Sequence, residues 1–341
     1  MKREVHRIAL MVAVLSGVCL GSITASSAAP SVWERARRPN AAAREALVEK
    51  ADHALNKGEM EKDRAELFGL LFGADAARLG KIEARFMLEE AGGANSPNMT
   101  VRLRYAGILR SMANDQKPLN RNGIESAAKI ITTVLASRPA PAMALLAWNE
   151  LALCHALLGQ REQEIHAYTE ALALEPVGPR RAMLLANRAE SYMGLGRLDD
   201  AIRGYRESLG SILFIDMYRF GVTTLWGLAV ALDRNGDVED ALEHIKLART
   251  YDKLDERIKD DSWFYSPPHD EHWYKALGYW AKARAETNSI DRAFEYGHAL
   301  EAWERYIDRA PANDPYLALA KVRRRACEIE RERKAHSAPK P

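Results

Sequence analysis

Three stretches of the chain repeat one pattern of apolar, small and polar positions. In each, a large apolar residue is followed four places later by alanine, and a glycine comes seven places after that: Trp148, Ala152 and Gly159; Leu185, Ala189 and Gly196; Leu225, Ala229 and Gly236. Residues four apart lie on one face of an α-helix. The pattern therefore predicts three helices that each pack along one face and end at a glycine.

A second segment with helical spacing follows each glycine. Tyr168 and Tyr205 occupy matching places in the first two of these segments, and Pro176 closes the first. Two helices pack closely only where one presents a small side chain, so the alanines are expected at the crossings and the bulky Trp148, Tyr168 and Tyr205 around them. Glycine favours the left-handed conformation that ends a helix, and proline cannot continue one. Each unit is thus predicted to be helix, turn, helix.

These residues resemble the tetratricopeptide repeat. The glycines are 37 and 40 residues apart, slightly more than the usual repeat of about 34. The resemblance implies an all-α fold, a right-handed superhelical solenoid of antiparallel helix pairs. The residues expected to build the repeats are Trp148, Ala152, Gly159, Tyr168, Pro176, Ala189, Gly196, Tyr205, Ala229 and Gly236.

The flanking segments carry weaker versions of the pattern, so the array is expected to span residues 96–311. Residues 42–95 are interpreted as divergent helices or a cap, with helices at 42–57, 61–78 and 81–91. Two of the flanking repeats are expected to hold insertions of about nine residues between their helices. A polar capping helix is expected at 312–334, as exposed array ends require, and a disordered tail at 335–341.

Residues 1–29 have the three parts of an export signal. Lys2, Arg3 and Arg7 precede an apolar run from Ile8 to Leu20, and small residues follow. The run is shorter than the roughly 20 residues of a membrane-spanning helix, which favours a cleavable signal peptide. Ala25 and Ala28 are candidate cleavage points, and a retained anchor is the alternative.

The residues before Cys19 do not fit a lipoprotein signal. We therefore expect a periplasmic or secreted protein without a transmembrane anchor after processing, with residues 30–41 as a linker.

Composition excludes some functions. Without residues 1–29 the chain has 46 basic and 46 acidic residues, so no general attraction to nucleic acid is expected. Cys154 and Cys327 fall in different repeats and are expected to pack inside helices rather than form a disulfide.

No phosphate-binding loop or catalytic constellation is present, so neither a catalytic residue nor a cofactor is expected. His269 and His272 could face one side of a helix as metal ligands. The stronger interpretation is a helix start in which Asp270 and Glu271 lie in the first turn, where acids are favourable. A metal-binding protein or enzyme using this region remains an alternative.

The repeat register implies a concave groove lined by the first helix of each pair. The residues expected to line it are Leu146, Asn149, Leu153, Met183, Glu190, Trp226, Val230, Asp233, Lys275 and Tyr279. An exposed apolar row of this kind indicates a protein or peptide partner.

The predicted function is therefore a non-catalytic scaffold or adaptor of the bacterial cell envelope, with a structural component of an envelope assembly as the alternative. Only Asn187 matches the residues with which members of this family clamp a terminal carboxylate. Leu153, Thr223 and Gly227 stand where polar clamp residues would be, so an apolar or mixed surface is favoured. Whether residues 252–268 cover the groove, and the oligomeric state, are left open.

Overall fold

The computed structural model describes residues 41–67, 73–175, 177, 179–212, 220–260, 265 and 267–336. They belong to one compact unit that begins at Ala41. The expected export signal at 1–29, almost all of the linker at 30–41, Pro176 and the last five residues of the expected tail lie outside the described residues.

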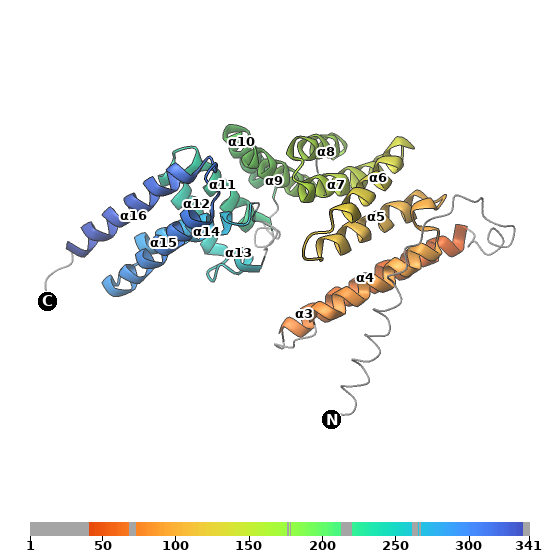
Figure 1. Ribbon diagram of the computed structural model, residues 1–341, viewed down its shortest axis with the longest axis horizontal. Helices are drawn as coiled ribbons and strands as arrows, with labels where there is room; N and C mark the ends of the chain where they lie inside the picture. Colours follow the sequence, from red (N-terminus) through yellow and green to blue (C-terminus); the bar gives the residue numbers. More distant parts are fainter. Residues whose placement is uncertain are drawn as a thin grey trace, which may run out of the picture. The chain divides into compact units, whose positions relative to one another are not determined.

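Every regular element in the described part of the chain is helical, and sequence neighbours pack as antiparallel pairs (Figure 1). The pairs are α3 (Ala41–Leu67) with α4 (Gly73–Glu90), α5 (Met99–Asn114) with α6 (Arg121–Ala136), α7 (Pro141–Leu158) with α8 (Arg161–Leu174), α9 (Pro179–Gly194) with α10 (Leu198–Ser211), α11 (Val222–Arg234) with α12 (Val238–Tyr251), and α14 (Asp270–Ala285) with α15 (Ser289–Arg309). A 3₁₀ turn, η1 (Gly93–Asn95), precedes α5, the short α13 (Glu256–Asp260) precedes α14, and α16 (Leu317–His336) packs on α15.

The three repeat glycines adopt the left-handed conformation predicted for them. Their φ angles are +73° at Gly159, +72° at Gly196 and +101° at Gly236. After each glycine the next helix begins within two residues, at Arg161, Leu198 and Val238. A residue with a Cβ pays a steric cost in this conformation, so these positions explain why the pairs turn where they do.

The crossings are built from small residues, as expected. Ala152, Ala189 and Ala229 are fully buried. At the crossing of α9 and α10 the approach is close enough that a Cβ placed on Gly204 would lie 2.9 Å from the Cβ of Ala189. Tyr168 and Tyr205 are each only 1% exposed, so these two aromatic rings fill the space beside the crossings.

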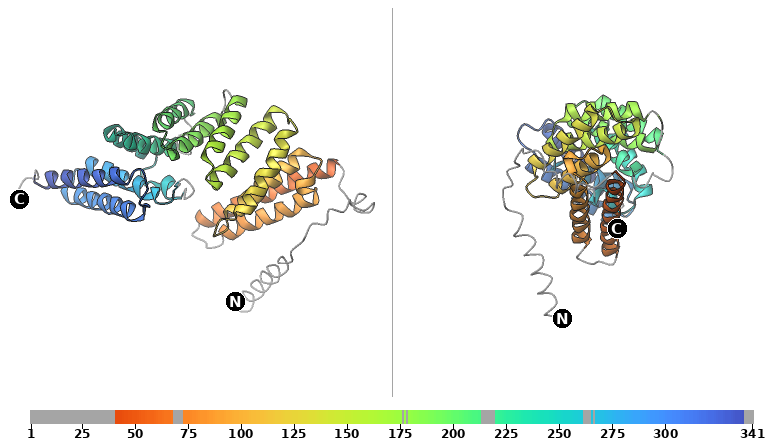
Figure 2. Two further views of the ribbon diagram at one scale, coloured as in Figure 1. Left: turned by 45° about the horizontal axis from the view of Figure 1, so that its top comes forward. Right: turned by 90° about the vertical axis from the view of Figure 1, so that its right-hand side faces the viewer.

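The first pair differs from the sequence-based expectation. Residues 42–91 form two helices, α3 and α4, rather than three, and Figure 2 shows them side by side. Gly58 and Gly80 do not end helices here. A Cβ on Gly80 would lie 2.6 Å from the carbonyl oxygen of Ala54 and 3.2 Å from the Cα of Gly58. These glycines permit close contact between α3 and α4 instead of marking turns.

The expected nine-residue insertion between the helices of the last pair is also wrong. Only residues 286–288 separate α14 from α15, because the additional residues extend the helices. Asn288 caps α15, its Oδ1 accepting from the backbone N–H of Ile290 at 2.8 Å. The capping helix α16 runs from Leu317 to His336 and is not polar throughout, since Ala320 and Cys327 are buried.

Helix α7 is the one described helix that is long and apolar enough to span a bilayer by length and composition. It contacts both α6 and α8, and its side chains contribute to two apolar clusters, through Ala147 and Leu151 on one side and Leu145 and Ala152 on the other. Core helices share this composition, and its position within the array accounts for it. Cys154 and Cys327 are both free and buried, in agreement with their expected packing role.

Candidate functional site

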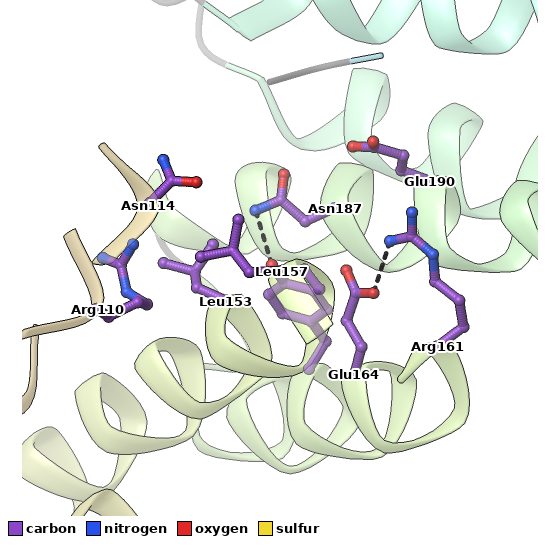
Figure 3. A pocket seen from close by; sticks show the side chains of 10 residues that line it. Arg110, Asn114, Leu153, Leu157, Arg161, Glu164, Asn187 and Glu190 are labelled. Atoms are coloured by element: carbon purple, nitrogen blue, oxygen red, sulfur yellow. Dashed lines mark hydrogen bonds and ion pairs between the residues drawn. The ribbon is translucent and has the colours of Figure 1, made fainter. Parts of the chain in front are cut away.

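A cavity of about 280 Å³ opens on the first helices of two successive pairs. We call it the α7–α9 cleft. It is lined by Arg110 and Asn114 of α5, Leu153, Ala156 and Leu157 of α7, Arg161, Glu164 and Tyr168 of α8, and Asn187 and Glu190 of α9. Figure 3 shows the α5 side chains on one side of the cleft, the two leucines between, and Asn187 and Glu190 beyond them.

The helical register explains this mixture of side chains. On α7, Leu151, Ala152 and Cys154 point into the core, whereas Leu153, Ala156 and Leu157 are only half-buried. The turn at Gly159 then places Arg161 and Glu164 of α8 at one end of the cleft. The repeat packing therefore leaves an apolar floor with charged groups around it.

Most polar groups of the cleft already have partners. Arg161 Nη1 donates to Glu164 Oε2 at 2.8 Å, and Arg110 Nε donates to Glu150 Oε2 at 2.9 Å. Asn187 Nδ2 donates to the Tyr168 hydroxyl at 3.3 Å. Asn187 was the one residue matching a carboxylate clamp, and here it supports a buried tyrosine. Burial raises the pKa of the Glu164 carboxyl, while the Arg161 guanidinium opposes that shift.

Glu190 is the exception among the charged groups of the cleft. Its carboxylate makes no hydrogen bond or close ion pair with the residues that the structure describes, and Figure 3 draws no interaction from it, in contrast to the bonded Arg161–Glu164 pair. Burial raises the pKa of Glu190 to about 8; Arg161 lowers it, and the negative charges of Glu164 and Asp270 raise it further.

A second cavity of about 300 Å³ lies along α11 and α14, and we call it the α11–α14 pocket. Its apolar lining comes from Trp226, Tyr274, Gly278, Tyr279 and from Ile258 of α13. The approach of α11 to α14 is close, since a Cβ on Gly278 would lie 2.8 Å from Cη2 of Trp226. The cationic residues at this pocket are Arg249, Lys253, Lys275 and Lys282.

The described part of residues 252–268, the segment after α12, lies at the α11–α14 pocket. Lys253, Leu254, Asp255 and Ile258 line this pocket together with Trp226, which is only 2% exposed. The Tyr265 hydroxyl donates to the Ile258 carbonyl at 2.7 Å, and the Tyr265 ring lies 5.3 Å edge-on from Tyr274. This segment is therefore a wall of the pocket.

Five of the ten expected groove residues line these two cavities. Leu153 and Glu190 line the α7–α9 cleft, and Trp226, Lys275 and Tyr279 line the α11–α14 pocket. Leu146 is exposed, and Asn149 and Met183 are half-buried, but none of these three lines either cavity.

The expectation was wrong for Val230 and Asp233, which are fully buried. Helix α11 has packed neighbours on every side, in α9, α10, α12, α13 and α14, so neither residue reaches a surface. Of the other two positions where a clamp would need polar residues, Thr223 is half-buried and Gly227 packs against Tyr205. Thr223 Oγ1 donates to the Phe220 carbonyl at 3.0 Å, and a Cβ on Gly227 would lie 2.6 Å from Cζ of Tyr205.

Asp233 belongs to a buried polar network that was not predicted from the sequence. It accepts from Arg323 Nε at 2.6 Å and from Trp273 Nε1 at 2.9 Å. The adjacent Arg234 Nη2 donates to Asp270 Oδ1 at 2.7 Å. One signal could have revealed it: counted from the glycine, Asp233 takes the place held by Ala156 and Met193 in the two preceding repeats.

His269 and His272 do not converge on a common point for a metal. His269 Nε2 lies 2.9 Å from Asp314 Oδ2, and Arg309 Nη1 donates to His272 Nε2 at 2.8 Å. Burial lowers the pKa of His272, and the neighbouring Arg309 adds to that shift. No group of three or more metal-ligating side chains occurs among the described residues.

Comparison with known proteins gives no family for this chain. No family model matches it, and no curated protein matches its sequence. In its described residues the structure defines an all-helical protein of sequential antiparallel pairs, and the α7–α9 cleft and the α11–α14 pocket are among its cavities.

Proposed function

We propose that this chain is an exported, non-catalytic tetratricopeptide-repeat-like adaptor of the bacterial cell envelope, and that it holds a protein or peptide segment at the α7–α9 cleft and the α11–α14 pocket. The observation that carries the proposal is the position of both cavities. Each lies on the first helix of successive pairs, where the repeat register predicts a ligand surface, and half of the expected groove residues line them.

The chemistry of the cavities supports binding rather than catalysis. Each combines an apolar floor with a few polar groups, which is how recognition sites are usually built. In the α7–α9 cleft the ionisable groups other than Glu190 are tied in structural pairs, namely Arg161 with Glu164 and Arg110 with Glu150. No nucleophile paired with a base lines either cavity among the described residues. Export rests on the leader alone, at residues 1–29.

Crosslinking in the cells that make the protein, followed by affinity purification and mass spectrometry, tests this proposal. Asn114 is exposed at the rim of the α7–α9 cleft, and Asn122 is exposed on α6 outside it. We expect Asn114→Trp to deplete a specific partner because the indole fills the cleft, whereas Asn122→Trp leaves that partner in place. Identical partner sets for wild type and both variants would refute binding at this cleft.

A further inference from the structure

We propose that the α7–α9 cleft binds a primary ammonium group, a lysine side chain of the partner, with the Glu190 carboxylate as its counter-ion and the leucine floor against its methylene chain. This inference rests on the proposed function, since it names the chemistry recognised at the same cleft.

The first argument is charge. Every other charged side chain that lines the cleft has an ion-pair partner: Arg161 with Glu164, and Arg110 with Glu150. Glu190 has none among the described residues, and Arg161, whose charge acts on it, is paired with Glu164. Glu190 is thus the lining charge without a counter-ion in the part of the chain that the structure describes, and a cationic ligand complements it. An anionic ligand would have to compete with the carboxylates that both arginines already bind.

The second argument is shape and hydrogen bonding. Asn187 lies three residues before Glu190 on α9, so the two side chains share a face of the helix. Because the Asn187 amide nitrogen is used on Tyr168, its oxygen is left to accept from a ligand. An ammonium group carries three donors and no acceptor. Leu153, Ala156 and Leu157 provide the apolar surface along which the stem of a lysine packs.

The surroundings of Glu190 should make the affinity for an ammonium group depend on pH. Its neighbours with charge or a titratable proton are Arg161, Glu164 and Tyr168 on α8, Tyr205 on α10, and Asp270 and Tyr274 on α14. Burial raises the pKa of Glu190 to about 8, so without a bound cation its carboxyl is mostly protonated at pH 7. A bound ammonium ion favours the ionised form, and binding releases that proton. Affinity therefore rises with pH up to about 8 and then levels off.

The test uses the full mature chain and three small probes that differ in one group: Nα-acetyl-lysine methylamide, the norleucine analogue, which lacks the ammonium, and the glutamate analogue, which reverses the charge. Binding is measured by ligand-observed NMR titration at pH 6 and pH 8. The lysine probe stays charged throughout because its pKa is about 10.4. The variant is Glu190→Gln, and the matched control is Glu162→Gln, an exposed glutamate on α8 that does not line the cleft.

We expect the lysine probe to bind wild type at least about tenfold more tightly than the norleucine and glutamate probes. We also expect it to bind roughly fiftyfold more tightly at pH 8 than at pH 6, because a carboxyl with a pKa of about 8 is about 1% ionised at pH 6 and about half ionised at pH 8. Glu190→Gln should abolish both the preference for the lysine probe and its pH dependence. Glu162→Gln should retain both. Equal binding of lysine and norleucine, preference for glutamate, or no binding by any probe overturns the inference. None of these results affects the crosslinking experiment with Asn114→Trp. The two experiments therefore distinguish a wrong cation site from a wrong proposed function.

Discussion

Arg323 on the last helix donates from Nε to Asp233 Oδ1 at 2.6 Å, across 90 residues of sequence. Its Nη2 also donates to the Asp233 backbone carbonyl at 3.1 Å. Asp233 is fully buried near the end of α11, and Trp273 of α14 donates to its other oxygen. Arg234 beside it lies over the rings of Trp273 and Tyr316, at 4.9 and 4.2 Å from their centres. One carboxylate thus joins α11, α14 and α16.

Replacing Arg323 should destabilise the C-terminal half strongly. Arg323→Leu leaves the Asp233 carboxylate buried without its cation, and losing one partner of a buried pair costs about 3–5 kcal/mol. Urea denaturation followed by circular dichroism measures the loss. Arg325→Leu is the control on the same helix, because the Arg325 side chain is 61% exposed in its pair with Glu328, and it should leave the unfolding midpoint nearly unchanged. Equal midpoints for the two variants would show that the buried pair does not hold α16.

Glu190 should make the protein less stable as pH rises. The pKa of Glu190 is about 8 in the fold, against an ordinary glutamate value of 4.5, so between those two pH values the folded chain holds a proton that the unfolded chain has released. The unfolding free energy therefore falls as pH rises through this window. We expect the drop between pH 5.5 and pH 8.5, measured by urea denaturation, to be smaller in Glu190→Gln than in wild type or Glu162→Gln. A drop of equal size in all three proteins would contradict the raised pKa.

The stability cost of substituting a repeat glycine should depend on its backbone conformation and not on the room available for a side chain. At Gly159 φ is +73°, and a Cβ would meet nothing within 4 Å. Gly159→Ala should therefore cost about 1 kcal/mol from strain alone, and Gly159→Asn less, because asparagine adopts this conformation more readily.

Gly297 in α15 is the matched comparison for the repeat glycines. It also meets nothing within 4 Å, but its φ is not positive, so Gly297→Ala should stabilise the fold by about 0.5–1 kcal/mol. Thermal unfolding of the three variants decides the point. A Gly159→Ala protein as stable as wild type would be inconsistent with the left-handed turn.

The two cysteines of the array should be inert in the folded protein. Burial raises the pKa of the Cys154 and Cys327 thiols to about 12 each, and the reactive species is the thiolate. We expect iodoacetamide at pH 8 to leave both unmodified by mass spectrometry until urea unfolds the chain. Rapid modification of either residue in the native protein would contradict its burial.

The repeat pattern predicted the helix pairs because it reflects local rules. Glycine in the left-handed conformation and alanine at a crossing are fixed by neighbours in the same pair, so Gly159 and Ala152 could be placed from spacing alone. The break expected between the helices at 61–78 and 81–91 was wrong because a glycine inside a helix, such as Gly80 in α4, and a glycine at a helix end look the same in sequence. Only the contact with Ala54 on another helix distinguishes them.

The groove residues were harder to predict because their exposure depends on neighbouring helices. Leu153 and Glu190 line a cavity, whereas Val230, three residues before Asp233, is fully buried. Helix α11 is covered by more neighbours than α7, including α13 from the inserted segment. The ion pair of Asp233 with Arg323 depends on contacts across 90 residues, which a repeat period of about 37 to 40 residues cannot reveal.

Site-specific photo-crosslinking tests the central claim, that the α7–α9 cleft holds a partner protein, most directly. A benzophenone side chain is placed at residue 114, on the rim of the cleft, and for comparison at residue 122, which is exposed on α6 away from it. On irradiation of intact cells we predict a discrete adduct of one protein species from position 114, reduced by Glu190→Gln, and none of that species from position 122. The same adducts from both positions, or none from position 114, would contradict the account.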